Sequence, residues 1–188
     1  MRPAGFVLTG GASRRMGRDK ALLEYRGVAL AAWVAARVEA AAGRVSLVGG
    51  GERYVHLGYP VLEERFAGSG PLSGIEAALR QGGAEWSLIV ACDMAGVRTE
   101  WLSELLQAAE DSGRQAVYAC RRDGRMEPLC AVYHESCGSE ALSRLQGAKL
   151  RVAAFLHEIN GLAWKAEWVE QLRNINTPAE WETVRNDR

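Results

Sequence analysis

One apolar run restricts the fold more than any other feature of the sequence: Trp-Ser-Leu-Ile-Val-Ala-Cys-Asp, at residues 86–93. Leu88, Ile89 and Val90 follow one another with no polar residue between them, so a strand built from them would be apolar on both faces. Such strands lie at the centre of parallel sheets, where helices cover each side. The run therefore predicts a central strand of an α/β domain.

Similar short apolar runs alternate with helical patterns along nearly the whole chain. Strands are predicted at 5–8, 44–49, 60–64, 86–93, 115–121 and 128–134, with an irregular strand at 162–169. Apolar residues at three- and four-residue steps, together with helix start and stop signals, predict helices within 29–43, 71–83, 99–113, 137–146, 151–158 and 177–186. Thr177 and Pro178 suit the start of the last helix, in which Trp181 is expected to be exposed. The alternation is typical of a layered α/β fold, in which ligands bind beyond the carboxyl ends of parallel strands.

The charge of the chain is balanced, with 23 Lys and Arg against 23 Asp and Glu in 188 residues. This balance argues against nucleic acid or an anionic membrane as a partner, since both need a strongly basic face. The apolar run 6–8 is too short for a secretory signal, and the run 28–36 is too short to span a membrane. The four cysteines lack zinc-site spacing, which favours scattered thiols in the core of a reduced protein. We therefore expect one cytoplasmic domain over residues 1–188.

Positive charge is nevertheless concentrated in Leu-Thr-Gly-Gly-Ala-Ser-Arg-Arg-Met-Gly-Arg-Asp-Lys, residues 8–20. Glycines let backbone N–H groups approach phosphates, and Arg and Lys add charge-assisted hydrogen bonds, so the loop is suited to an oligophosphate. A solvated basic turn is the alternative. The spacing fits neither a P-loop, because Gly17 is followed by Arg18 and Asp19, nor a dinucleotide fingerprint.

Two further features are expected at the same edge of the sheet. Asp93 ends the central strand, and a single carboxylate suffices for Mg²⁺ when phosphate oxygens and waters complete its coordination. An N-cap or turn role is the alternative for Asp93. The stretch 68–75 is a second glycine-rich entry into a helix, whose N-terminus can bind an anion. By contrast, Asp123 with Gly124 is best explained as a turn between two strands.

The first loop resembles the signature loop of nucleotidyltransferases with a glycosyltransferase-A-like fold, and within them the molybdenum cofactor guanylyltransferases. Four more segments agree in order, namely 70–74, 92–93, 127–129 and 174–178, so the resemblance spans nearly the whole chain. It implies a three-layer α/β/α Rossmann-like fold with a mostly parallel central sheet. It also implies a single nucleotidyltransferase domain, nucleotide-binding in its N-terminal half and molybdopterin-binding in its C-terminal half.

The activity implied by the resemblance is transfer of GMP from Mg-GTP to the phosphate of molybdenum-molybdopterin, with release of pyrophosphate. Molybdenum-insertion proteins and chaperones of molybdoenzymes are its implied partners. Arg15, Lys20 and Asp93 would be catalytic, with Asp93 binding magnesium (Mg²⁺). The substrate-binding residues carried over are Leu8, Thr9, Gly10, Gly11, Lys20, Gly70, Gly74 and Asp93 for the nucleotide and pocket shape, and Arg151, Asn174 and Asn176 for the pterin side.

This chain departs from the family pattern where the family has an aspartate that reads the guanine base. Glu64 stands there instead, with one more methylene, and a glycine among residues 49–51 replaces the usual asparagine. The implied mechanism needs no general base, because the acceptor phosphate is already a nucleophile and must only be positioned while charge is neutralised. The alternatives are a cytidylyltransferase of the same superfamily and a non-catalytic carrier of GTP or molybdopterin.

Overall fold

The computed structural model describes residues 3–10 and 18–186, and within them seven strands form one sheet in the order β5-β4-β1-β6-β8-β7-β9. Only β8 among these strands runs antiparallel to its neighbours, so the sheet is mostly parallel, as predicted. Two short strands, β2 and β3, form a separate antiparallel hairpin.

The strands are β1 (Ala4–Leu8), β2 (Glu24–Tyr25), β3 (Val28–Ala29), β4 (Val45–Val48), β5 (Val61–Leu62), β6 (Trp86–Ala91), β7 (Ala116–Cys120), β8 (Met126–His134) and β9 (Leu162–Trp164). The α-helices are α1 (Leu30–Ala42), α2 (Pro71–Gln81), α3 (Thr99–Ser112), α4 (Gly138–Gln146), α5 (Val152–Glu158) and α6 (Pro178–Asn186). Short 3₁₀ helices are η1 (Lys20–Leu22), η2 (Gly51–Leu57), η3 (Glu135–Cys137) and η4 (Glu167–Gln171).

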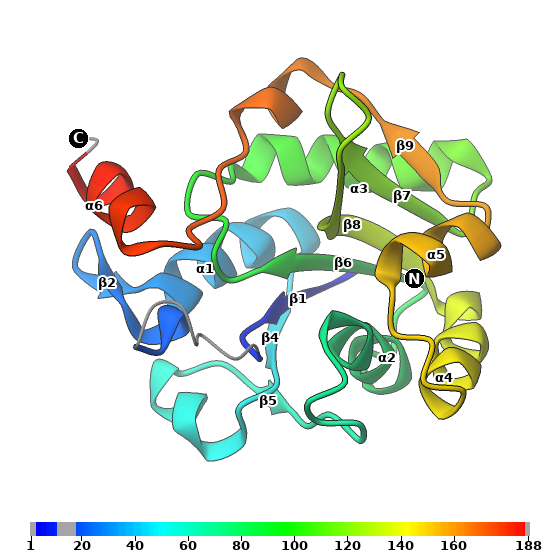
Figure 1. Cartoon of the computed structure of the whole chain (residues 1–188), viewed down its shortest axis with the longest axis horizontal. Coiled ribbons are helices and arrows are strands. Elements are labelled where there is room, and N and C mark those ends of the chain that lie inside the picture. The colour runs from blue at the N-terminus through cyan, green and yellow to red at the C-terminus, as the bar shows by residue number, and fades with distance from the viewer. Residues whose placement is uncertain (1–2, 11–17, 187–188) are drawn as a thin grey trace.

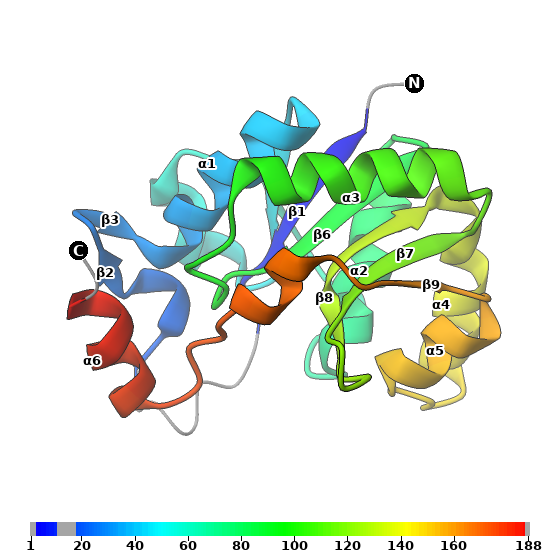
Figure 2. The ribbon, with the colours of Figure 1, turned by 90° about the horizontal axis from the view of Figure 1, so that it is seen from above.

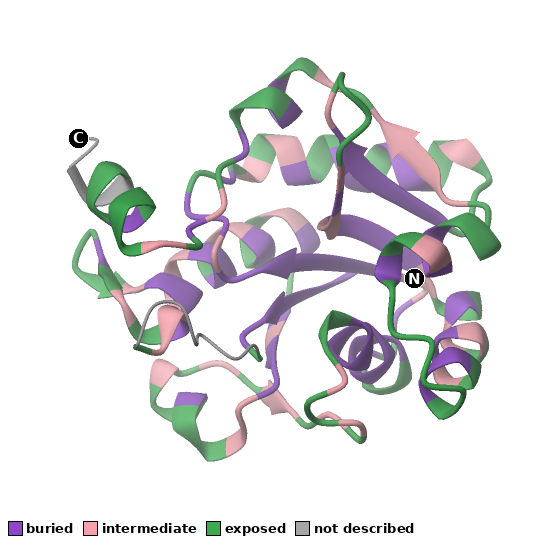
Figure 3. Cartoon of the chain, viewed as in Figure 1, coloured by how far each residue is buried: buried purple, intermediate pink, exposed green. Residues whose placement is uncertain are grey.

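Helices cover both faces of the sheet, which gives the predicted three layers (Figure 2). α1 and α3 pack on one face, whereas α2, α4 and α5 pack on the other. Side chains of β1 alternate between these layers: Val7 packs with α1 and α3, and Phe6 and Leu8 pack with α2. The central strands are the most buried part of the molecule (Figure 3). The apolar run of β6 is therefore central, because it has helices on both sides.

Local signals set several helix ends. α1 ends at Gly43, which adopts a left-handed conformation (φ +80°), and the Gly43 N–H donates a hydrogen bond to the Glu39 carbonyl. Pro71 occupies the first turn of α2. Asp123 Oδ1 accepts the Arg125 N–H at 2.8 Å in the β7–β8 turn, so the turn interpretation of Asp123 is confirmed. All four cysteines are buried and unpaired, as expected for core thiols.

Two expectations differ from the structure, and some elements had no prediction. The predicted strand 162–169 stops at Trp164, and the chain then forms η4, because Trp168 and Val169 turn inward to pack on the α1–α3 layer. Trp181 is buried, not exposed, and packs against Tyr25 with ring centroids 6.2 Å apart. The hairpin β2–β3 and η2 were not predicted.

Among the described residues, no helix has the length and apolar character needed to cross a membrane.

Candidate functional site

The carboxyl ends of β1, β4 and β6 lie side by side and are tied together just beyond the last residue of each strand. The Thr9 N–H donates to the Val48 carbonyl at 3.0 Å, and the Cys92 N–H donates to the Leu8 carbonyl at 3.1 Å. The Thr9 hydroxyl also lies 2.9 Å from the Val48 carbonyl oxygen and 3.0 Å from that of Gly49. Leu8 and Thr9 are buried, so both form the floor of this edge.

Glu64 lies against three glycines at this edge. A Cβ atom at Gly10 would be 3.1 Å from Glu64 Oε2, and one at Gly49 would be 3.0 Å from the same oxygen. At Gly74 of α2, a Cβ would lie 3.0 Å from Leu8 and 3.5 Å from Glu64 Oε1. Burial raises the pKa of the Glu64 carboxyl, an effect that Ser73 opposes. The glycines therefore leave room for this longer carboxylate beside the first loop.

Lys20 joins two predicted parts of the site that are far apart in sequence. Its ammonium group donates to Asn176 Oδ1 at 3.0 Å and lies 3.5 Å from Asp93 Oδ2. Burial raises the pKa of the Asp93 carboxyl, and the positive charge of Lys20 offsets part of that rise. The residue predicted to hold phosphates thus meets the predicted metal ligand and a residue predicted for the pterin side.

The start of η1 is fixed by a contact that sequence analysis did not predict. Asp19 caps η1 by accepting the Ala21 N–H at 3.1 Å, and its second oxygen accepts the Tyr54 hydroxyl at 2.8 Å. Tyr54 is 2 % exposed, and its ring lies under Gly50, where a Cβ would be 2.0 Å from the ring. Tyr54 is therefore a positioning residue. It holds the Asp19 side chain, and because Lys20 follows Asp19 directly, it also helps to fix the backbone from which Lys20 extends.

The segment after η4 brings Asn176 to Lys20. The Ile175 N–H donates to the Asp93 carbonyl at 3.0 Å. Glu180 accepts the N–H groups of Asn176 (2.7 Å) and Thr177 (2.9 Å), while Thr177 Oγ1 accepts the Glu180 N–H. This reciprocal arrangement is a capping box, so the predicted N-cap role of Thr177 is confirmed. The contacts with its backbone N–H partners lower the pKa of Glu180.

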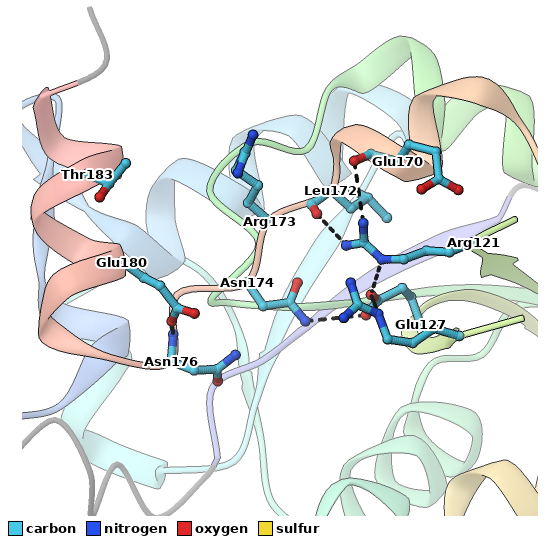
Figure 4. Close-up of a pocket in the computed structure, with 10 residues that line it drawn as sticks. Arg121, Glu127, Glu170, Leu172, Arg173, Asn174, Asn176, Glu180 and Thr183 are labelled. Carbon is cyan, nitrogen blue, oxygen red and sulfur yellow. Dashed lines mark hydrogen bonds and ion pairs between the residues drawn. The ribbon is translucent and has the colours of Figure 1, made fainter. Parts of the chain in front are cut away.

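A cavity of about 510 Å³ opens beside this segment (Figure 4). Buried Glu127 lies at its base, 3.0 Å from Arg121 Nε, 3.7 Å from Arg125 Nε and 3.3 Å from Asn174 Nδ2. Asn174 Oδ1 is buried and has no hydrogen-bond partner in the described part of the chain. The cavity therefore offers cations and amides to an anionic, polar ligand. The site residues Arg121 and Arg125 were missed, and their only sequence signal was their place beside the predicted turn.

Some predicted residues lie elsewhere or outside the described residues. Gly11 and Arg15 fall outside the described residues. Gly70 precedes α2 with φ +74°, a conformation that favours glycine. Arg151 stands at the N-cap position of α5, without a side-chain capping bond, and is not among the residues that line the cavity; its carbonyl accepts a hydrogen bond from Arg144. The role of Arg151 on the pterin side therefore stays a prediction.

The site also meets the requirement for a metal that is shared with a phosphate. Across residues 3–10 and 18–186, no group of three His, Cys, Asp or Glu side chains is placed to hold a metal. Mg²⁺ does not need one, because phosphate oxygens and waters supply most of its ligands. Asp93, with its side chain 20 % exposed at the carboxyl edge of the sheet, would supply the one carboxylate that this coordination requires.

A mostly parallel three-layer fold, a glycine-rich first loop and a Lys–Asp pair at the carboxyl edge together define the class as a nucleotidyltransferase. The model of the MobA-like NTP transferase domain matches residues 5–161, and the chain belongs to that family.

Relatives agree over almost the full length. A probable molybdenum cofactor guanylyltransferase of Carboxydothermus hydrogenoformans is 32% identical over 185 residues, which are 95% of this chain and 92% of the relative. One of Pelotomaculum thermopropionicum is 34% identical over 188 residues, 96% and 90% of the two chains. The crystal structure of molybdopterin-guanine dinucleotide biosynthesis protein A from Archaeoglobus fulgidus superposes with a TM-score of 0.81 at 26% identity, covering 97% of this chain and 96% of that one.

Proposed function

We propose that this protein transfers GMP from Mg-GTP to the terminal phosphate of molybdenum-molybdopterin, forming the guanine dinucleotide cofactor and pyrophosphate. The observation that carries the proposal is that the Lys20 ammonium group lies 3.0 Å from Asn176 Oδ1 and 3.5 Å from Asp93 Oδ2. This point lies between the nucleotide edge of the sheet and the cavity beside residues 170–176. The names of the relatives support guanylyl transfer as the reaction.

The chain's own residues act by positioning and by charge. An oxygen of the acceptor phosphate attacks the α-phosphorus of GTP, and the bond from that phosphorus to the β-phosphate oxygen breaks. Lys20 and Arg15 reduce repulsion between the two anions and stabilise the leaving pyrophosphate. Asp93 would hold Mg²⁺, which supplies further positive charge to the phosphates when it is bound. No side chain is needed as a general base.

The cavity of Figure 4 suits the acceptor. Arg121 and Arg125 offer positive charge to a phosphate, and the Asn174 amide, with its unpartnered oxygen, offers hydrogen bonds to a polar heterocycle. Its volume of about 510 Å³ lies within the range of small-molecule sites. Asn176 would then lie where the acceptor phosphate meets Lys20.

Glu64 is proposed to read the guanine base, accepting from its N1–H and its exocyclic amine. Replacing Glu64 by glutamine puts a donor in place of one acceptor, so GTP affinity is expected to fall by about tenfold. Calorimetric titration with GTP and CTP measures the change. Glu63→Gln is the matched control, because Glu63 is exposed and is expected to bind GTP like the wild type. Unchanged GTP affinity in Glu64→Gln would contradict a base-reading role.

The decisive experiment combines the purified chain, molybdenum-molybdopterin and Mg²⁺ with GTP, CTP or ATP. The expected result is formation of the guanine dinucleotide and an equal amount of pyrophosphate with GTP alone. Product formed from CTP in preference to GTP would make the protein a cytidylyltransferase. Binding of GTP and molybdopterin without release of pyrophosphate would make it a carrier.

A further inference from the structure

A second cavity, of about 550 Å³, lies on the other side of the segment 170–173 from the cavity described above. The hairpin β2–β3, the start of α1, the loop 95–98 and the start of α3 supply its walls. Figure 2 shows these elements on the α1–α3 side of the molecule. Its polar lining is dominated by four arginines: Arg26, Arg37, Arg98 and Arg173.

Three of these guanidinium groups lie over aromatic rings of the same cavity. Arg37 lies 3.4 Å from the centroid of the Trp33 ring, with Arg26 5.4 Å from it. Arg98 lies 5.0 Å from the centroid of Trp101, which stacks in turn on Trp168 at 5.4 Å. Stacking on a ring fixes the plane of a guanidinium while its N–H donors at the edge keep their directions. The cavity therefore holds oriented donors.

The backbone at Arg26 is strained. Arg26 and Gly27 connect β2 to β3, and both have positive φ, +51° and +85°. Asparagine and glycine are the residues that favour such a two-residue turn, whereas an arginine there is uncommon. The strained position places the Arg26 guanidinium over Trp33 and Tyr25, at the rim of the cavity. Strain of this kind persists at sites where the side chain has a role.

Two of the four arginines have side chains without a charged partner among the described residues. The side chains of Arg98 and Arg173 make no hydrogen bond or ion pair with the described residues, and in Figure 4 the Arg173 side chain points away from the Arg121–Glu127 pair. Glu170 is the one acidic residue that the described part of the chain contributes to the lining, and its Oε1 accepts the Arg122 N–H at 2.7 Å on the hairpin β7–β8. Burial lowers the pKa of Arg37, and the charge of Arg26 adds to the decrease, while Tyr25 and Glu100 oppose it.

We propose that this second cavity binds an oligophosphate, either free or carried by a nucleoside, at a site separate from the proposed transfer reaction. Several guanidinium groups around one small cavity match an anion whose charges are equally close together, and they bind phosphate oxygens in pairs. Arginines lie over Trp33 and Trp101, so the phosphates and not a base are the recognised part. The proposal does not depend on which nucleotide the protein transfers.

The test is calorimetric titration of the full chain with inorganic pyrophosphate, without divalent cations, repeated in Lys20→Ala to remove the nucleotide edge. Arg98→Gln and Arg26→Asn are each expected to weaken binding by about tenfold or more. Arg26→Asn also relieves the strained turn and is expected to raise the melting temperature, so its weaker binding could not come from unfolding. Arg114→Gln, which removes an exposed charge beyond the end of α3, is the matched control and is expected to bind like the wild type.

Competition by GTP and ATP alike would support recognition of the phosphates of a nucleotide, and binding of pyrophosphate alone would support a free oligophosphate. The proposal would be overturned if Arg98→Gln and Arg26→Asn left the affinity for pyrophosphate unchanged. It would also be overturned if Lys20→Ala alone abolished pyrophosphate binding. Binding of hexaglutamate but not pyrophosphate would also overturn it and would indicate an acidic peptide.

Discussion

Replacing Asp93 by asparagine is expected to lower the rate of GMP transfer by about 10²–10³-fold or more, because a preorganised charge at the reacting phosphates is lost. Asparagine keeps the size of the side chain, and the Asp93 carbonyl still accepts the Ile175 N–H. Burial of the Asp93 carboxyl raises its pKa, which means that the charged form of this side chain makes folding less favourable. Asparagine is neutral and removes this unfavourable contribution, so the variant should fold. Rates of pyrophosphate release with GTP and molybdopterin measure the effect.

Asp111→Asn is the matched control, because Asp111 is exposed near the end of α3 and its carboxylate accepts only from the Gln107 amide among the described side chains. It should transfer GMP at the wild-type rate. Affinity for GTP without divalent cation should change little in Asp93→Asn, since Lys20 and the first loop remain, whereas the gain in affinity on adding Mg²⁺ should disappear. Wild-type transfer rates in Asp93→Asn would contradict a role of Asp93 in the reaction.

The layers of the fold followed from local pattern, because each buried strand and each amphipathic helix is specified by residues close in sequence. β6 and α2 began at the predicted residues, so Asp93 lies at the predicted carboxyl edge of the sheet, where the Cys92 N–H donates to the Leu8 carbonyl at the end of β1. The end of the strand at 162–169 was wrong for a physical reason. Trp168 is drawn toward Trp101 and Glu104, on a helix more than 60 residues away, and no local pattern carries that information.

The site was less accessible to prediction than the fold, because its contacts join residues far apart in sequence. Lys20 and Asn176 are separated by 156 positions, and they were brought to one site only by the family resemblance. Tyr54 lies in a 3₁₀ helix without apolar periodicity, so nothing marked it as the partner of Asp19. Glu127 stood within a segment shared with the family, yet its burial under two arginines is a property of the β7–β8 hairpin and the segment 170–174 together.

Removing the Glu127 side chain is expected to cause the largest loss of stability among the substitutions considered, about 3–5 kcal/mol for Glu127→Ala. The Arg121 side chain is only 12 % exposed and would be left as a buried charge without its carboxylate partner. Glu167→Ala is the matched control, since it breaks the ion pair between Glu167 and Arg122 beside the same hairpin. The side chains of that pair are 91 % (Glu167) and 69 % (Arg122) exposed. That pair should contribute no more than about 1 kcal/mol. Urea unfolding followed by circular dichroism measures both.

A second variant separates lost charge pairing from lost volume. Combining Glu127→Leu with Arg121→Met removes both charges and fills the space, so it should recover much of the stability, because an apolar pair often replaces a buried ion pair without loss. Recovery should be incomplete, since Arg121 also donates to the carbonyls of Glu170 and Leu172. Equal unfolding midpoints for Glu127→Ala and Glu167→Ala would show that the buried pair contributes little. Glu127 also accepts from Asn174 Nδ2, so the buried pair is linked through residues 174–176 to Asn176 beside Lys20.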